Sequence, residues 1–201
     1  MTWPFAITDE QAMWRVQNAD DHAAFAQLVS RWEQPIQRLC ARMTGDLHRA
    51  EDLAQEAFSR VFFRRRDYQP AAKFSTWLWR IAINLCHDEL RRRQRRPEHP
   101  LEAEGDDASE GTAVQFPGQG LSPAEVVEKL EQAELVRRAL VQLPETYREV
   151  VVLRHYEGLK FHEIAEVLGI PEGTVKSRMF EALDRLEGTL KRLGAVPGQH
   201  R

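Results

Sequence analysis

The chain has 201 residues, of which 42% are hydrophobic and 29% charged, and a formal net charge of -3, a composition typical of a globular protein with one ordinary domain or two small ones. No window approaches the roughly 18 consecutive apolar residues of a membrane span, and the start MTWPFAITDE has neither the basic nor the apolar region of a secretory signal. We therefore expect a cytoplasmic protein with no membrane insertion of its own.

The small net charge conceals two strongly charged blocks. Residues 57–96 hold eleven Lys and Arg against three Asp and Glu, a net charge of +8, whereas residues 97–128 hold eight acidic residues and no Lys or Arg. Because the local field decides whether a phosphate backbone is attracted, the basic block is a candidate nucleic-acid surface in spite of the acidic total.

Apolar residues recur at three-to-four spacing through most of the chain and no segment alternates convincingly as a strand does, so the predicted fold class is all-α. Thr8 and Gln11 form a capping box that opens a first short helix. A second helix starts at Asp20 or Asp21 and contains Pro35, which should kink it. Its apolar stripe consists of Phe25, Leu28, Val29, Trp32, Ile36 and Leu39.

A third helix is expected between Asp46 and about Arg66, because Gly45 can end the helix before it and Asp46 can cap the new one. The segment RDYQPAAK indicates a loop. Ser75 is the expected cap of a long fourth helix that stops before Pro97. We predict that these four helices, within residues 1–96, form a first domain.

Residues 97–121 contain Pro, Gly, Ser and acidic residues and show no apolar periodicity. This composition is typical of a solvated, flexible linker. A segment of this length extends to about 85 Å. The two flanking domains are therefore expected to be able to work far apart.

A second small helical domain is predicted over residues 122–194. Ser122 and Glu125 form a capping box for its first helix, and Gly158 and Gly169 stand where helices should end. The three further helices are expected from Pro144 to about Tyr156, from about Phe161 to Leu168, and from about Glu172 to Leu193.

The last two helices of this domain have the pattern of a helix-turn-helix with Gly169 in the turn, although an ordinary corner between two helices would show similar spacing. The apolar residues expected to face one another are Ile164, Ala165 and Leu168 on the first helix and Val175, Met179, Ala182, Leu183 and Leu186 on the second. Helical geometry then exposes Lys176, Ser177, Phe180, Glu181 and Asp184 on the open side.

Two exposed residues of that helix have alternative interpretations. Phe180 can pack on a thymine methyl group or against a protein partner. Glu181 can accept a hydrogen bond from a cytosine amino group, or it can pair with Arg185 at i+4 on a solvated face.

A helix-turn-helix repressor does not require the segment between residues 50 and 96, so this segment decides between an ordinary repressor and a more specialised protein. Asp52, Gln55 and Glu56 share one helix face with Ser59 and can meet a basic helix. Residues 73–96 interleave aromatic rings with cations, as single-stranded nucleic acid requires, although core packing is the simpler interpretation of Trp77 and Ile81, which are spaced at i,i+4.

The two cysteines, Cys40 and Cys86, are isolated among helix-type residues, so we expect two reduced thiols in the core. His87 beside Cys86 has no further ligands at suitable spacing, and no metal site is predicted.

Three segments resemble two conserved regions of a known family. AEDLAQEAF and KFSTWLWRIAINLCHDELRRR resemble the second conserved region of the extracytoplasmic-function, or group IV, sigma factors of bacterial RNA polymerase, and LPETYREVVVLRHYEGLKFHEIAEVLGIPEGTVKSRMFEAL resembles their fourth region. The resemblance implies a non-catalytic subunit without cofactors that binds core RNA polymerase, directs it to specific promoters and promotes melting of the minus-ten element. A stand-alone helix-turn-helix regulator is the alternative, and a helical adaptor that binds no DNA is a third class.

The resemblance also implies the roles of individual residues, which fall into three sets. The set for core polymerase is Asp52, Gln55 and Glu56. The set for the melted minus-ten element is Lys73, Phe74, Ser75, Thr76, Trp79, Asn84, Arg91, Arg92 and Arg93, with Asn84 reading a flipped base. The set for the duplex minus-thirty-five element is Thr174, Lys176, Ser177, Arg178, Phe180 and Glu181.

The resemblance further implies that the linker threads the polymerase active-site cleft and that regulation comes from outside, usually from an anti-sigma protein. The family often has Arg where this chain has Glu181 and Leu183. Recognition of the upstream element is therefore expected to be weaker or to favour an unusual sequence.

Overall fold

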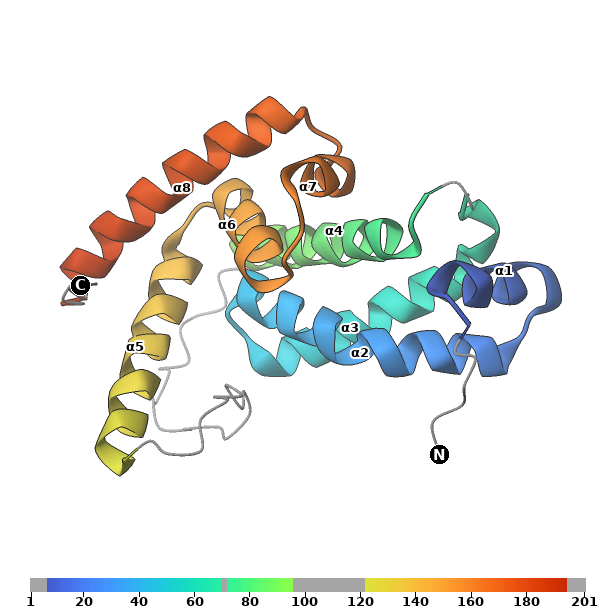
Figure 1. The fold of residues 1–201 in the computed structure, drawn as a ribbon, viewed down its shortest axis with the longest axis horizontal. Coiled ribbons are helices and arrows are strands. Elements are labelled where there is room, and N and C mark those ends of the chain that lie inside the picture. The colour runs from blue at the N-terminus through green and yellow to red at the C-terminus, as the bar shows by residue number, and fades with distance from the viewer. Residues whose placement is uncertain (1–6, 70–71, 96–121, 195–201) are drawn as a thin grey trace.

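The computed structural model describes residues 7–69, 72–95 and 122–194, and for residues 123–128 the backbone alone. All regular structure in these ranges is helical, as predicted. Figure 1 shows the long helix α4 in the middle of the molecule, with α2 and α3 along one side of it and α6 and α7 along the other. The predicted linker, residues 97–121, lies outside the described residues.

The N-terminal unit consists of α1 (Asp9–Ala19), α2 (His22–Thr44), α3 (Leu47–Phe63), the short 3-10 helix η1 (Arg65–Asp67) and α4 (Phe74–Arg95). The predicted capping box of Thr8 and Gln11 is present, and Asp21 and Asp46 cap α2 and α3. Gly45 takes a left-handed φ of 75°, which ends α2 and turns the chain into α3.

Two details of this unit differ from the sequence prediction. The α-helical part of the third helix ends at Phe63, and η1 continues to Asp67. Ser75 does not cap α4, because the helix already begins at Phe74. The backbone N–H of Phe74 instead donates to the Glu10 carboxylate of α1 at 3.3 Å, a tertiary contact without a local sequence signal.

The C-terminal unit consists of α5 (Pro123–Gln142), α6 (Glu145–Val151), the π-helical turn η2 (Val152–Tyr156), α7 (Phe161–Leu168) and α8 (Glu172–Arg192). Gly158 and Gly169 have φ values of 71° and 67°, which confirms their predicted role at helix ends. The predicted capping box at Ser122 involves the Glu125 side chain, which lies outside the described part.

The helix-turn-helix packs almost as predicted. Val175, Met179 and Ala182 of α8 are buried, but Leu183 is 46% exposed, so its predicted burial is wrong. The buried stripe steps from Met179 to Ala182 and then to the partly buried Leu186, which leaves Leu183 one position outside it.

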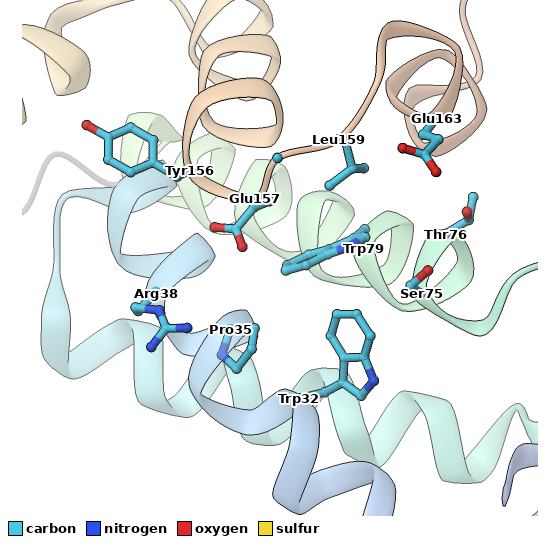
Figure 2. A pocket seen from close by; sticks show the side chains of 11 residues that line it. Trp32, Pro35, Arg38, Ser75, Thr76, Trp79, Tyr156, Glu157, Leu159 and Glu163 are labelled. Carbon is cyan, nitrogen blue, oxygen red and sulfur yellow. The ribbon is translucent and has the colours of Figure 1, made fainter. Parts of the chain in front are cut away.

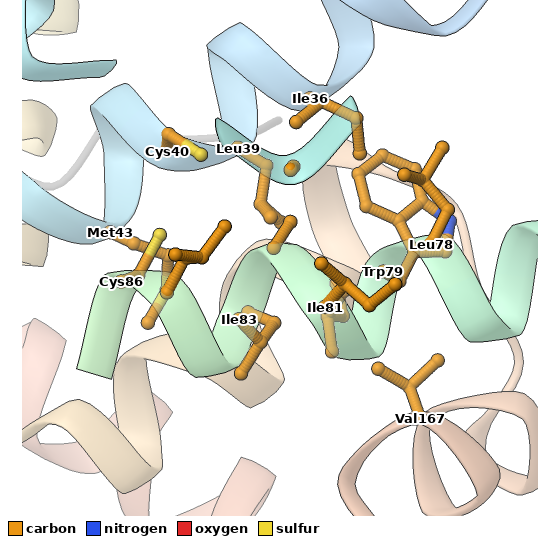
Figure 3. Close-up of a cluster of buried hydrophobic side chains, with 14 of the residues drawn as sticks. Ile36, Leu39, Cys40, Met43, Leu78, Trp79, Ile81, Ile83, Cys86 and Val167 are labelled. Atoms are coloured by element: carbon orange, nitrogen blue, oxygen red, sulfur yellow. The ribbon is translucent and has the colours of Figure 1, made fainter. Parts of the chain in front are cut away.

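The buried apolar side chains of the two units form one continuous cluster. Figure 3 shows how α4 joins them: Leu39, Cys40 and Met43 of α2 pack on one side of α4, and Val167 of α7 approaches from the other. A helix covered on two sides needs apolar residues around most of its circumference, which explains the burial of Leu78, Trp79, Ile81, Ala82, Ile83, Leu85 and Cys86. Cys40 and Cys86 are free, buried thiols.

Candidate nucleic-acid interface

The predicted minus-ten residues follow α4 from its first turn to its basic end. Lys73 and Asn84 are exposed, and Ser75 and Thr76 are half-buried. Arg91, Arg92 and Arg93 project from the last turns, with side chains between 39% and 60% exposed. The polar members of the set are therefore all at least partly accessible.

Phe74 and Trp79 do not lie on this surface. Phe74 is fully buried and Trp79 is 4% exposed, and the Trp79 ring meets that of Trp32 edge-to-face at 5.5 Å between centroids. Such pairs stabilise a core beyond the area they bury. Stacking on a base requires a free face of the ring. Both rings are buried in the core, so the expectation of accessible rings at these two positions is not met.

The basic end of α4 is organised around one buried carboxylate, Glu89, which is 4% exposed. Arg92 and Arg93 donate to its Oε1 at 3.0 and 3.1 Å, and Arg49 of α3 reaches its Oε2 at 3.1 Å. Burial alone would raise the pKa of Glu89, but the hydrogen bonds from the three arginines outweigh it and hold the pKa below its ordinary value of 4.5. Arg49 thus ties α3 to α4 through Glu89, whereas Arg92 and Arg93, two of the three predicted phosphate-binding arginines, bind the same carboxylate from within α4.

This depressed pKa predicts an acid-sensitive contribution to stability. Its stabilisation is complete above pH 4.5 and is lost as the pH falls through the lower pKa of the folded state. We expect Glu89→Gln to be less stable at neutral pH by roughly 2 kcal/mol, less than for a fully buried ion pair because the arginines stay partly exposed. Urea denaturation at a series of pH values should show the difference from wild type shrinking below pH 4.5. Glu51→Gln, at an exposed position of α3, is the control; a gap that stays constant with pH would contradict the assignment.

The predicted polymerase-binding residues lie together on the outer face of α3. Asp52 and Gln55 are exposed and Glu56 is half-buried; Arg49 and Arg60 pair with the two acids at 2.9 and 2.7 Å. Beside them a groove of about 220 Å³ runs between α2 and α3, lined by Val29, Glu33, Gln37, Glu51, Ala54, Gln55 and Phe58. An acidic rim around an apolar floor suits a basic helix with apolar side chains.

The helix α8 exposes the side predicted for DNA. Phe180 is 78% exposed, and Lys176 and Ser177 are exposed on the same side, as expected. Lys176 pairs with Glu172 at 2.7 Å, and the Ser177 hydroxyl donates to the Thr174 carbonyl at 3.0 Å. These partners lie within α8 and are solvent-accessible, so they can exchange for a nucleic acid.

Arg178 is placed differently from its neighbours. Its guanidinium pairs at 3.0 Å with the Glu149 carboxylate of α6, and that carboxylate belongs to a residue only 3% exposed. His87 Nε2 of α4 lies 2.9 Å from the other oxygen of Glu149. Arg178 therefore fixes α8 on α6, a role that residue type and spacing did not reveal.

Glu181 accepts from Arg185, with Nε at 3.1 Å and a terminal nitrogen at 3.0 Å, so the i+4 interpretation describes its geometry here. The Arg185 guanidinium also lies 4.9 Å from the centre of the Tyr147 ring, a cation–π contact. Glu181 thus helps to hold Arg185 against α6.

Between the two units lies a cavity of about 330 Å³. Figure 2 shows Trp32, Pro35 and Arg38 of α2 on one side, Trp79 with Ser75 and Thr76 of α4 beside them, and Tyr156, Glu157, Leu159 and Glu163 of the C-terminal unit opposite. Glu157 pairs with Arg42 at 3.3 Å, and burial raises the pKa of Glu157. Sequence reasoning missed this junction, because contacts between distant segments leave no periodicity.

Within the described ranges, no cluster of His, Cys, Asp and Glu is arranged to hold a metal ion. None of the helices described there is both long and apolar enough to cross a membrane.

Comparison with known proteins shows which protein family the chain belongs to. The family model for sigma-70 region 2 matches residues 28–96, and that for sigma-70 region 4 matches residues 133–186. The chain is 39% identical over 175 residues to the ECF RNA polymerase sigma factor SigW of Bacillus subtilis, covering 86% of this chain and 92% of SigW. The chain belongs to the extracytoplasmic-function sigma factors.

Other relatives of this sigma factor include the RNA polymerase sigma-H factor of Pseudomonas aeruginosa, 36% identical with 92% of this chain and 95% of the relative covered. The ECF sigma-E factor of Escherichia coli K12 is 31% identical, with 93% and 96% covered. Among solved structures, CnrH in complex with the cytosolic domain of CnrY has a TM-score of 0.66 at 23% identity, covering 92% of this chain and 97% of that one, a likeness of fold.

This sigma factor is thus a subunit that binds core RNA polymerase, directs it to specific promoters and promotes melting of the minus-ten element. A stand-alone helix-turn-helix regulator is not favoured, because the region 2 match covers the N-terminal unit, for which such a regulator has no use.

Proposed function

We propose that the two units of this sigma factor divide promoter recognition. Residues 1–96 bind core polymerase and the minus-ten element, residues 97–121 act as a linker, and residues 122–194 bind the minus-thirty-five element. The observation that carries this proposal is the exposed face of α8, where Phe180 is 78% exposed beside the exposed Lys176 and Ser177. An exposed aromatic ring flanked by a hydroxyl and an ammonium group suits contact with base edges and phosphates in a major groove.

On the N-terminal unit, we assign the exposed carboxylate of Asp52 and the amide of Gln55 to a basic surface of core polymerase, with Glu56 beside them. Lys73, Ser75 and Thr76 are assigned to the melted strand at the start of α4, and Asn84 to a flipped base. Arg91 is the most readily available of the three arginines predicted to contact this strand, because the ion pair it makes among the described residues, with Asp88, is as long as 3.7 Å. Phe74 and Trp79 support this surface from the core.

The same proposal gives the C-terminal unit a smaller set of direct DNA contacts than its sequence suggested. Lys176, Ser177 and Phe180 touch the minus-thirty-five element, with Thr174 at the entry of α8. Arg178 positions the helix through Glu149, and Glu181 acts through Arg185.

The decisive experiment adds the purified chain to sigma-free core polymerase and a pool of genomic fragments and maps the transcript starts. We expect specific starts preceded by a shared two-part sequence, and loss of those starts when Asp52 and Gln55 are both changed to Lys. Specific starts that survive this double change would refute the assignment of the α3 face.

A finer prediction concerns Glu181. We expect Glu181→Ala to tighten binding to the minus-thirty-five duplex about twofold to fivefold at low salt, because an acid leaves the DNA-facing helix and Arg185 is released. The order of preference among duplex sequences should stay the same. Competition binding against single-base variants of the duplex measures both effects.

The control for this experiment is Glu187→Ala, which removes a similar i+4 pair with Lys191 further along α8. If Glu181 reads a cytosine, its loss relaxes selectivity at one base pair, and the pairing with Arg185 is then not its function.

We also propose that this sigma factor acts in the cytoplasm, together with the polymerase, and that an anti-sigma protein regulates it. The structure of CnrH contains the cytosolic domain of CnrY, and that of RpoE from Bartonella quintana, with a TM-score of 0.62, contains the anti-sigma factor NepR. The catalytic chemistry of transcription is assigned to the polymerase alone. Affinity capture from cells of the source organism, followed by inhibition of transcription in vitro, tests the regulator.

A further inference from the structure

Two apolar side chains stand together on the exposed face of α8, which lies at the edge of the molecule with α6 and α7 on its inner side (Figure 1). Phe180 is 78% exposed and Leu183 is 46% exposed. Residues at i and i+3 are neighbours on a helix, with Cβ atoms about 5–6 Å apart. The buried stripe of α8 includes neither residue, so core packing does not explain their apolar character. We call Phe180 and Leu183 the apolar pair.

The two arginines in the middle of α8 are engaged with α6 on the other side of the helix. Arg178 pairs with the buried Glu149 carboxylate at 3.0 Å, and the Arg185 guanidinium lies 4.9 Å from the centre of the Tyr147 ring. An arginine that donates to guanine is the commonest specific contact in a major groove, and Asn and Gln are the residues that suit adenine. The helix contains no Asn or Gln, and both of these guanidinium groups are directed towards α6.

The apolar pair supplies a different kind of base contact. An apolar side chain distinguishes thymine from the other bases through the C5-methyl group in the major groove. Residues at i and i+3 are separated by about 4.5 Å along a helix axis, whereas successive base pairs are separated by about 3.4 Å. Two such side chains can therefore reach methyl groups on neighbouring base pairs, or on pairs with one pair between them.

The residues beside the apolar pair favour DNA over a protein as its partner. Lys176 precedes Phe180 by one turn and Leu183 by two, so the three share a side of the helix. The Lys176 ammonium is exposed, and its ion pair with Glu172 is solvent-accessible. A major groove offers methyl groups on its floor and phosphates on its rim, which matches an apolar pair followed back along the helix by a cation.

We infer that the apolar pair reads thymine methyl groups, so that the minus-thirty-five element of this sigma factor contains two T·A pairs, adjacent or with one pair between them, opposite Phe180 and Leu183. The assignment of Leu183 rests on the proposed binding of α8 to the minus-thirty-five duplex. It adds a contact that the sequence prediction had placed in the core, and it gives the class of sequence that the helix selects.

Replacing thymine by uracil tests this assignment, because uracil lacks the methyl group and keeps the hydrogen-bonding groups of the base. The chain is assembled with core polymerase and bound to promoters mapped with it, in which each thymine of the minus-thirty-five element is replaced in turn. We expect replacement at two positions to weaken binding by about threefold to fivefold each, and their combination by roughly tenfold or more. Uracil in the spacer between the two promoter elements should have no effect.

Alanine variants connect each methyl group to a side chain. Phe180→Ala should bind thymine and uracil equally at one of the two positions, and Leu183→Ala at the other. Leu130→Ala is the matched control, because Leu130 is 48% exposed on α5, and it should keep the full sensitivity to uracil. Since these side chains are largely exposed, their removal should leave the fold intact, which circular dichroism checks.

The outcomes separate the methyl contact from the function on which it depends. Equal binding of thymine and uracil promoters by the wild type would overturn the methyl contact, and so would full sensitivity in the double variant Phe180→Ala/Leu183→Ala. An element without two such T·A pairs would contradict it as well. If the wild type shows no preference among upstream sequences of any kind, α8 does not read DNA, and the proposed function of the C-terminal unit fails together with the role of the apolar pair.

Discussion

Arg148→Ala is expected to lower the free energy of unfolding by about 3 kcal/mol, because it removes several hydrogen bonds from a charged, buried donor. Arg148 is 5% exposed, and its guanidinium donates to the carbonyls of Met43, Val141 and Leu143, the last at 2.8 Å. These carbonyls belong to the ends of α2 and α5 and to the turn after α5. Alanine would leave them buried without a donor.

Urea denaturation of the full chain measures this effect, followed by circular dichroism. Arg148→Lys keeps the charge but loses the planar fork that spans carbonyls of both units, so it should fall between alanine and wild type. Arg137→Ala, which removes an exposed arginine paired with Glu134 within α5, should change stability by less than about 1 kcal/mol. A similar loss for Arg137→Ala and Arg148→Ala would show that the bridging hydrogen bonds of Arg148 contribute little.

The features of this fold that could be predicted from the sequence are those that depend on interactions between residues close together along the chain. Thr8, Asp46, Gly158 and Gly169 act on backbone groups within a few residues, so their caps and turns could be located from the sequence alone. Helix periodicity likewise located the buried stripe of α8 to within one residue. The all-α class and the helix order required nothing more than such local signals.

Two of the errors arose where a partner lies far away in sequence. At the start of α4, Glu10 accepts from the backbone N–H of Phe74, 64 residues further along the chain, and Trp79 packs against Trp32 in the core. The functional surfaces show the same division. Exposure of Phe180 and Lys176 followed from helical geometry, whereas the binding of Arg178 by Glu149 needed two helices to meet.

The junction between the units could not be predicted at all from spacing. Arg80 and Arg148 look like surface or DNA-binding cations in the sequence, and only the folded chain brings them to helix ends of the other unit. A basic residue is ambiguous in sequence because phosphates, carboxylates and helix carbonyls all satisfy a guanidinium. The burial of the side chain distinguishes these three kinds of partner, and burial is known only once the tertiary structure is known.

Asn84→Ala is expected to slow promoter opening by about tenfold or more while leaving the initial binding of duplex promoter within about twofold, because a flipped base loses its hydrogen bonds only after melting. The side chain of Asn84 is exposed on α4, so its removal should not alter folding. Opening is followed by the fluorescence of 2-aminopurine in the minus-ten element, and initial binding by competition at a temperature where the promoter stays closed.

Asp88→Ala is the matched control for Asn84→Ala, since Asp88 lies one turn further along α4 with a side chain that is 60% exposed. It should leave opening unchanged or slightly faster, because an acid leaves a surface that meets phosphates. A promoter with a premelted minus-ten element adds a second constraint: Asn84→Ala should still bind it more weakly than wild type, since the missing contact is to the single strand. If premelting restores full affinity, or if duplex binding falls as much as opening, Asn84 acts before melting and does not read the flipped base.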